Sequence, residues 1–312
     1  AETVGAIADE AGVPGSDNPV DARHAPTSTQ ELAGVMAEHS VFGRVMPAQK
    51  QQMVDALQLG GSTVAMTGDG VNDVLALKNA DLGIAMGNGS GATRAVAQLV
   101  LLDSKWSVLP TVVAEGRRVL GNIERVSDVF LTKSVYSTVI SVLTGVFAVV
   151  FPFLPRHLSL VSALTIGIPG FFLALMPNKE RFRPGFFRRV LAFAIPAGII
   201  AAASAWTSYA VALWVSEPVL NAQKAATVSL FIVATGVLAI SARPLNLVRW
   251  GIIGLMVASF AAVIYIPPLS EFFALSLSPE PYSVVAIAVG LAGAVAVWGA
   301  GLVADRWRRA RK

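Results

Sequence analysis

Two aspartates four residues apart stand in a glycine-rich turn, in the run TGDGVND that begins at Thr67. An apolar run ends at Thr67 and a helical pattern follows, so Asp69 lies on the turn and Asp73 in the first helical turn. Open parallel sheets bind their ligands at this end of a strand. Two carboxylates, with water and a phosphate oxygen, suit Mg²⁺, which prefers six oxygen ligands. The spacing therefore indicates a magnesium site for phosphoryl transfer.

Three neighbours extend this candidate site. Gly68 permits close approach of the backbone, and Asn72 adds a neutral donor and acceptor. Lys50 stands upstream in the first turn of a predicted helix that follows a strand, where its ammonium can neutralise a phosphate at the same sheet edge. Two plainer interpretations stay open, in which Asp73 only caps a helix within an Asp/Gly-rich turn and Lys50 is a solvated helix charge.

The segment up to Asp103 alternates short apolar runs with helical patterns, and this alternation predicts a parallel sheet covered by helices on both faces. We therefore expect part of an α/β domain over residues 1–111. The predicted strands are residues 41–45, 62–67, 82–86 and 99–103, and the predicted helices are residues 48–58, 71–80 and 91–98.

Beyond the α/β pattern the chain becomes strongly apolar. Residues 112–125 predict a stalk helix that runs without a breaker into an all-α membrane domain over residues 126–312. Six apolar runs in this domain are each long enough to cross a hydrocarbon core of about 30 Å. The predicted spans are residues 126–151, 158–176, 190–214, 225–242, 247–266 and 282–303.

Charge orients the predicted spans and excludes other classes of protein. Residues 1–125 hold 14 acidic and 9 basic side chains, whereas residues 126–312 hold 6 and 15. Most of the latter bases fall in the loops after the second and fourth spans and in the tail, which predicts that the α/β domain and the tail are both cytosolic. The bases are not interleaved with aromatics in one patch, so we expect no nucleic-acid partner. The chain has no cysteine, which excludes disulfides and thiolate metal sites.

Three runs in this order carry a resemblance to a known family: FGRVMPAQK, TGDGVNDVLALKNADLGIAMGNG, and VLLD followed by a long helix. They resemble the rear half of the phosphorylation domain of P-type cation-transporting ATPases, whose calcium-pump and sodium-pump branches carry six spans after that domain. The resemblance implies a haloacid dehalogenase-like fold that uses Mg²⁺ and ATP.

The same resemblance assigns roles to the candidate residues. It implies that Asp69 helps to hold Mg²⁺ and that Asp73 and Asn72 support the metal and the phosphate. It implies further that Lys50 contacts an aspartyl phosphate and that Thr67 and Gly68 begin the hinge of the phosphate-binding motif. The mechanism is then electrostatic positioning around Mg²⁺ and a phosphoryl group.

The family's phosphorylated aspartate lies in a D-K-T-G-T motif, which is absent from these 312 residues. We therefore expect the C-terminal part of a bacterial plasma-membrane pump whose partners are membrane lipid, the N-terminal part of the same protein and the transported cation. Ca²⁺ export is favoured, and another divalent or a monovalent cation stays open. Two alternatives are a non-catalytic truncated membrane subunit and a membrane-anchored dehalogenase-type phosphatase, although a phosphatase anchor needs only one span.

Candidate residues for the ion pathway are neutral. By resemblance to the calcium branch they are Thr138 and Ser141 in the first span and Ser162, Thr165 and Pro169 in the second. A helix break at Pro169 would free backbone carbonyls as hard oxygen ligands. The spans are expected to hold no acidic side chain, which predicts one ion per cycle. The alternative is that these hydroxyls bond to their own or a neighbouring helix.

Overall fold

The structure, a computed structural model, describes residues 1–176, 185–215, 217–276 and 281–309. The chain divides into two compact units, Ala1–Val112 and Val113–Lys312, which are called the α/β unit and the helical unit below. The helix α6 (Leu109–Phe147) begins in the first unit and continues into the second. It is the covalent connection between them.

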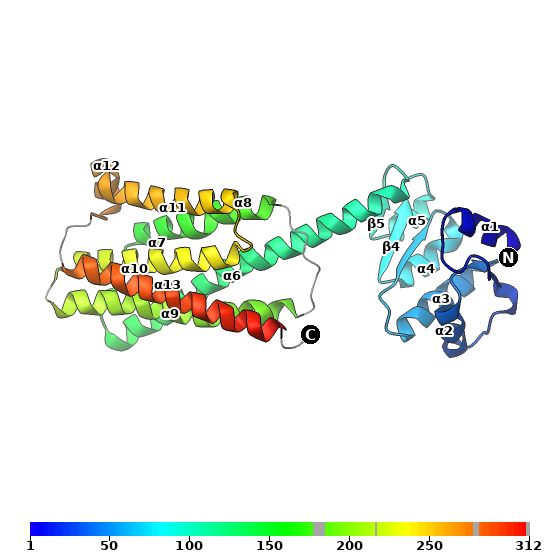
Figure 1. Ribbon diagram of the computed structural model, residues 1–312, viewed down its shortest axis with the longest axis horizontal. Coiled ribbons are helices and arrows are strands. Elements are labelled where there is room, and N and C mark those ends of the chain that lie inside the picture. The colour runs from blue at the N-terminus through cyan, green and yellow to red at the C-terminus, as the bar shows by residue number, and fades with distance from the viewer. Residues whose placement is uncertain (177–184, 216, 277–280, 310–312) are drawn as a thin grey trace. The chain divides into compact units, whose positions relative to one another are not determined.

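The α/β unit contains a three-stranded parallel sheet in the order β3-β4-β5 and a separate parallel pair, β1-β2 (Figure 1). In the three-stranded sheet Thr67 pairs with Ile84, and Ile84 pairs with Leu99. The strands are β1 (Val20–Asp21), β2 (Phe42–Gly43), β3 (Ala65–Gly68), β4 (Leu82–Met86) and β5 (Leu99–Leu101).

Helices connect these strands, as the alternating pattern predicts. The α-helices are α1 (Glu2–Glu10), α2 (Thr29–Glu38), α3 (Pro47–Leu59), α4 (Val74–Asn79) and α5 (Gly91–Val96). Short 3₁₀ turns lie at η1 (Ala22–His24), η2 (Val71–Asp73) and η3 (Trp106–Val108). The strand predicted over residues 41–45 is shorter than expected, because Arg44 has a positive φ of 57° that ends the extended backbone.

A small apolar cluster fixes α3 and α4 against the sheet. Val54 of α3, Val64 before β3, and Ala76 and Ala80 at α4 pack together and are buried. Pro47 stands in the first turn of α3, where its missing N–H is not needed, and the side chain of Gln49 accepts the free N–H of Met46 at 2.9 Å. This packing sets where Lys50 leaves the first turn of α3.

Asp81 ties the loop before β4 to the loop before β3, and it predicts a pH dependence of stability. The Val64 N–H donates to its carboxylate at 2.8 Å and the Gln58 amide at 3.2 Å, which holds the pKa of Asp81 below its ordinary value of 3.8. A lowered pKa in the folded state stabilises the fold above the ordinary value, and this stabilisation is lost as the pH falls below it.

We therefore expect the unfolding midpoint of Asp81→Asn to fall less than that of the unaltered chain between about pH 6 and about pH 3. The Asp17→Asn variant is the control, because Asp17 is exposed and has no hydrogen-bond partner among the described residues. Equal falls in the Asp81→Asn variant and the unaltered chain would show that this carboxylate is not coupled to folding.

The helical unit contains the membrane-crossing part of the chain. Within the described residues six helices are long and apolar enough to cross a membrane, as the sequence predicts. Their segments are α6, then α7 (Pro155–Ser162) with η4 (Ala163–Gly167) and α8 (Ile168–Leu175), α9 (Phe186–Trp214), α10 (Val219–Ser241), α11 (Leu247–Tyr265) and α13 (Pro281–Arg309), with a short α12 (Pro267–Phe273) after α11. The first apolar helix ends at Phe147, four residues before the predicted boundary, and Ala148 has a positive φ of 50° there.

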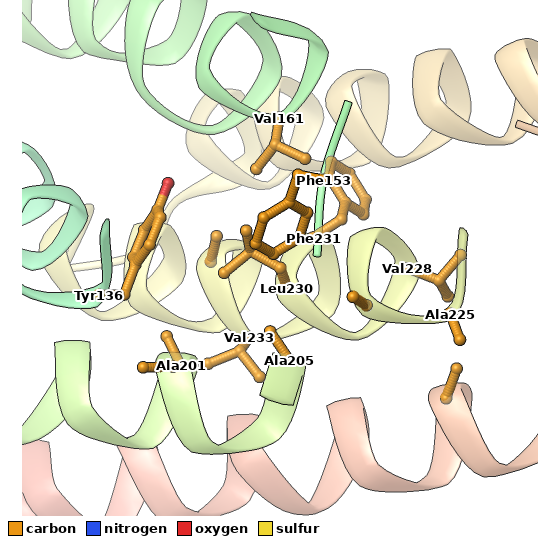
Figure 2. Close-up of a cluster of buried hydrophobic side chains, with 14 of the residues drawn as sticks. Tyr136, Phe153, Val161, Ala201, Ala205, Ala225, Val228, Leu230, Phe231 and Val233 are labelled. Atoms are coloured by element: carbon orange, nitrogen blue, oxygen red, sulfur yellow. The ribbon is translucent and has the colours of Figure 1, made fainter. Parts of the chain in front are cut away.

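Helices α9, α10 and α13 pack side by side (Figure 1). Their contacts depend on small residues: a Cβ built on Gly293 of α13 would lie 2.3 Å from Ser204 Oγ of α9 and 2.7 Å from a methyl of Val233 of α10. Small residues let helices approach closely where lipid supplies no hydrophobic drive for association. The larger apolar side chains of the unit gather in a cluster that includes Leu230 and Phe231 (Figure 2).

The second span is not one continuous α-helix. A π-helical turn, η4, separates α7 from α8, immediately before Pro169. Proline has no N–H to offer the carbonyl of Thr165 four residues earlier, and its ring crowds that carbonyl, so the regular hydrogen-bond ladder cannot continue there. The end of α8 is fastened to α6, because the Asn122 amide donates to the carbonyls of Ala174 at 2.8 Å and Met176 at 2.9 Å.

Candidate functional site

The two predicted acidic residues lie at the carboxyl end of β3, but in different surroundings. Asp69 directly follows the strand and is exposed, whereas Asp73 ends η2 and is only 6% exposed. The ammonium of Lys50 reaches Asp73 from α3 and donates to Oδ1 at 2.5 Å. A carboxylate this deeply buried needs a charged partner, and Lys50 supplies it. Lys50 and Asp73 are thus brought together from two segments, and Asp69 stands four residues before Asp73 at the same end of β3.

Both plainer interpretations of these residues are at odds with this geometry. Asp73 stands at the N-cap position of α4, but its side chain makes no capping hydrogen bond within the described chain. Lys50 is an ion-pair partner of a buried carboxylate and not a solvated helix charge. The pair joins positions 23 residues apart.

The backbone before the aspartates is built for close approach. A Cβ on Gly68 would lie 2.5 Å from the Cβ of Asp73 and 2.7 Å from its Oδ2, so any side chain at this position would displace the carboxylate. Thr67 is the third residue of β3 and partly buried, and Asn72 is exposed on η2 beside the turn. Gly68 therefore has a steric role that the sequence pattern only suggested.

The donor set fits Mg²⁺. The exposed carboxylate of Asp69, the second oxygen of Asp73 and the amide oxygen of Asn72 are hard oxygen donors at one end of a strand. In the part of the chain that the structure describes, no three His, Asp or Glu side chains cluster as a closed metal cage. A site with two carboxylates leaves coordination positions for water and phosphate oxygens, which is how Mg²⁺ is usually held.

The predicted pathway residues of the first span do not face the bundle. Thr138 and Ser141 lie on the exposed side of α6, and the Thr138 hydroxyl donates to the Ser134 carbonyl of its own helix at 2.8 Å. The buried side of α6 carries Thr132 and Tyr136 instead. The hydroxyl of Thr138 is thus satisfied within α6, as the alternative interpretation holds.

The predicted residues of the second span gather at the π-helical turn. Thr165 is buried and donates to the Val161 carbonyl at 2.7 Å, Pro169 is buried in α8, and the Ser162 hydroxyl is buried with no hydrogen-bond partner among the described residues. A small cavity with room for about one water molecule lies beside Thr165, and Thr132 and Tyr136 line it from α6. Tyr136 also belongs to the buried apolar cluster (Figure 2).

Charged residues missed in the sequence lie near the start of the membrane-crossing part of α6. Asp128 falls inside the first predicted span and is buried, so the expectation that the spans hold no acidic side chain is wrong. Glu124 lies one turn before Asp128 on α6, and it accepts a bidentate ion pair from Arg189 of α9, with N–O distances of 2.9 Å and 2.8 Å. The Asp128 carboxylate also interacts electrostatically with the Arg189 guanidinium. In the sequence, Asp128 lies two residues inside the span boundary predicted at residue 126.

Comparison with known proteins finds similar sequences over both units. Residues 19–81 match the family of haloacid dehalogenase-like hydrolases. The calcium-transporting ATPase CtpE of Mycolicibacterium smegmatis is 45% identical over 99% of this chain and 41% of its own length. The probable cation-transporting ATPase exp7 of Streptococcus pneumoniae is 36% identical over 64% of this chain and 26% of its own length. Among solved structures, the catalytic domain of the CPx-ATPase CopB-B matches 26% of this chain and 32% of that chain with a TM-score of 0.23.

The similarity to CtpE extends through the α/β unit and all six apolar helices, although the chain spans only about two fifths of the length of that relative. The haloacid dehalogenase-like segment contains Lys50, Asp69 and Asp73. Together with the parallel sheet and the six helices long and apolar enough to cross a membrane, these similarities support the assignment of this chain as part of a multi-pass P-type cation-transporting ATPase.

Proposed function

We propose that this chain is part of an ATP-driven pump that moves a cation out of the cytosol through an aspartyl-phosphate intermediate. The observation that carries the proposal is the Lys50–Asp73 ion pair beside the exposed Asp69, at the carboxyl end of β3. The similarity to CtpE, a calcium-transporting ATPase, favours Ca²⁺ as the cation. Basic loops after the second and fourth spans support a cytosolic α/β unit in a plasma membrane.

The residues of the site divide the work between them. Asp69, Asp73 and Asn72 would hold Mg²⁺, which neutralises negative charge on a phosphoryl group in transfer. Lys50 forms an ion pair with the buried Asp73 and adds a positive charge at the sheet edge. Gly68 leaves room for the Asp73 carboxylate, so the oxygens are set in place before a phosphate arrives.

The π-helical turn supports a role for the second span in the cation pathway. The turn and Pro169 interrupt the regular ladder around Thr165, whose carbonyl cannot accept from the proline nitrogen. Ser162 and Thr165 add hydroxyl oxygens to the same turn. Backbone and hydroxyl oxygens of this kind suit a hard cation, with a carboxylate from another part of the protein completing the charge.

Phosphorylation from ATP tests the proposal in the whole protein. Membranes that contain it should incorporate label from γ-labelled ATP into an acid-stable, hydroxylamine-sensitive product that requires Mg²⁺ and the transported cation. A panel of Ca²⁺, Mn²⁺, Zn²⁺, Na⁺ and K⁺ identifies that cation by the label that each supports. Absence of label with every cation would favour the non-catalytic subunit, and hydrolysis of small phosphate esters without cation dependence would favour the phosphatase.

A further inference from the structure

The loop after β4 lies against the backbone of Asp69, the exposed carboxylate of the site. Ser90, at the end of this loop, donates its backbone N–H to the Asp69 carbonyl at 2.7 Å. Gly89 is packed so closely that a Cβ there would lie 2.9 Å from the Asp69 carbonyl oxygen and 3.1 Å from the Asp69 Cα. The run GNGSG therefore has a steric reason for its glycine at position 89, and the reason concerns Asp69.

Thr93, in the first turn of α5, contacts the same carbonyl through its side chain. Its hydroxyl donates to the Asp69 carbonyl at 3.2 Å and lies 3.5 Å from the Gly70 carbonyl. Thr93 is fully buried, at 0% exposure. Because Thr93 lies in the first turn of α5, no carbonyl of that helix stands four residues before it, and its hydroxyl donates to another segment instead.

A second hydroxyl holds Thr93 in this orientation. The Ser90 side chain accepts the Thr93 N–H at 3.1 Å, and the two side-chain hydroxyls are in direct contact. The Thr93 oxygen accepts from Ser90 when its own proton is given to the Asp69 carbonyl. The result is a chain of hydrogen bonds from Ser90 through Thr93 to the backbone of Asp69.

We infer that Thr93, oriented by Ser90, is a positioning residue for the Asp69 carboxylate. Asp69 lies on an exposed turn, and no side-chain partner fixes its carboxylate within the described residues. Two donors on its carbonyl, with Gly89 behind it, restrict the backbone from which the carboxylate projects. Groups that hold a metal ligand in place typically contribute about 10-fold to 100-fold to metal affinity. The effect on Mg²⁺ binding rests on the proposed function, whereas the contact of Thr93 with Asp69 does not.

The first test measures the contact without ATP or metal. Hydrogen exchange of the full chain, followed by mass spectrometry, reports the Ser90 amide that donates to Asp69. We expect Thr93→Val, which keeps the shape but loses the hydroxyl, to speed exchange in this loop about tenfold, and Thr93→Ser to exchange like the unaltered chain. Thr63→Val is the control, since Thr63 is exposed outside the site. Equal protection in Thr93→Val and the unaltered chain would overturn the inference.

The second test measures Mg²⁺ dependence in the whole protein. Thr93→Val should raise the Mg²⁺ concentration for half-maximal phosphoenzyme about tenfold or more, and Thr93→Ser should restore it. Faster exchange with an unchanged Mg²⁺ dependence would reduce Thr93 to a structural role and refute the inference. If the unaltered protein forms no phosphoenzyme, the proposed function fails, and the exchange experiment still decides the contact. If Thr93→Val does not fold, Ser90→Ala gives the same readouts, because it removes the hydroxyl that orients Thr93.

Discussion

Replacing Asp73 with asparagine in the whole protein is expected to reduce phosphoenzyme formation to background, a loss of at least about 100-fold. The substitution keeps the size and shape of the side chain. This matters because Asp73 packs closely against Gly68, where a Cβ would lie 2.5 Å from the Cβ of Asp73. It removes the negative charge that the buried site presents to Lys50 and to Mg²⁺. Charge placed where it is needed in the transition state is usually the largest single contribution to such a reaction.

The fold should survive this substitution. Lys50 is partly exposed, so its ammonium can turn to water when Asp73 becomes neutral. The measurement is labelling from γ-labelled ATP at saturating Mg²⁺, with the thermal unfolding midpoint as the check on folding. Asp17→Asn is the matched control, because it neutralises an exposed aspartate outside the site. Normal labelling of Asp73→Asn would refute the magnesium assignment.

Replacing Gly293 with valine is expected to destabilise the helical unit by at least about 1–3 kcal/mol. The new side chain would overlap Ser204 of α9 and Val233 of α10 at once. Both neighbours belong to the closely packed helices α9 and α10, so neither can move aside without separating the three-helix core. Overpacking of this kind forces side chains off their rotamers or moves the backbone.

The same helix provides a control for this prediction. Gly299 also lies on α13, but no atom lies within 4 Å of a Cβ built there, and the residue is exposed. Gly299→Val changes helix propensity as Gly293→Val does, yet it should shift stability by less than about 0.5 kcal/mol. Thermal unfolding in detergent compares the two variants. Equal midpoints for both would show that the contact of α13 with α9 and α10 is not as close as the structure has it.

Motifs with a local cause were predictable from the sequence. The strand over residues 82–86, the helix that begins before Lys50 and the six apolar helices all follow from patterns within one segment. The disturbance near Pro169 was predictable for the same reason, because proline acts on its own helix. The π-helical turn lies before the proline and not at it, since the carbonyl that loses its partner is four residues earlier.

Features that depend on two segments were not predictable. Periodicity groups Thr138 with Ser141, but it cannot say whether that side of α6 faces the bundle, and the structure buries Thr132 and Tyr136 instead. The contact of Lys50 with Asp73 and that of Thr93 with Asp69 both join positions far apart in the chain. A single sequence gives no distance between such positions, so their partners could not be assigned.

The sequence alone shows that Asp128 is an acidic residue near the start of the first predicted span, but it does not show which side chains surround it. In the structure the Asp128 side chain is buried and interacts electrostatically with Arg189, whose guanidinium also forms an ion pair with Glu124. Burying a carboxylate without a positive partner is costly. The partner of Asp128 therefore has to be known before a role can be assigned to it, and the sequence does not give that partner.

ATP-dependent cation transport by the whole protein is the decisive measurement. Sealed inside-out membrane vesicles that contain the whole protein should accumulate ⁴⁵Ca²⁺, or the cation identified by phosphorylation, only when ATP and Mg²⁺ are both present. We expect this uptake to be released by an ionophore and to be absent in Asp73→Asn vesicles. Uptake by Asp73→Asn vesicles equal to that of the unaltered protein, or no ATP-dependent uptake of any cation, would contradict the proposed function.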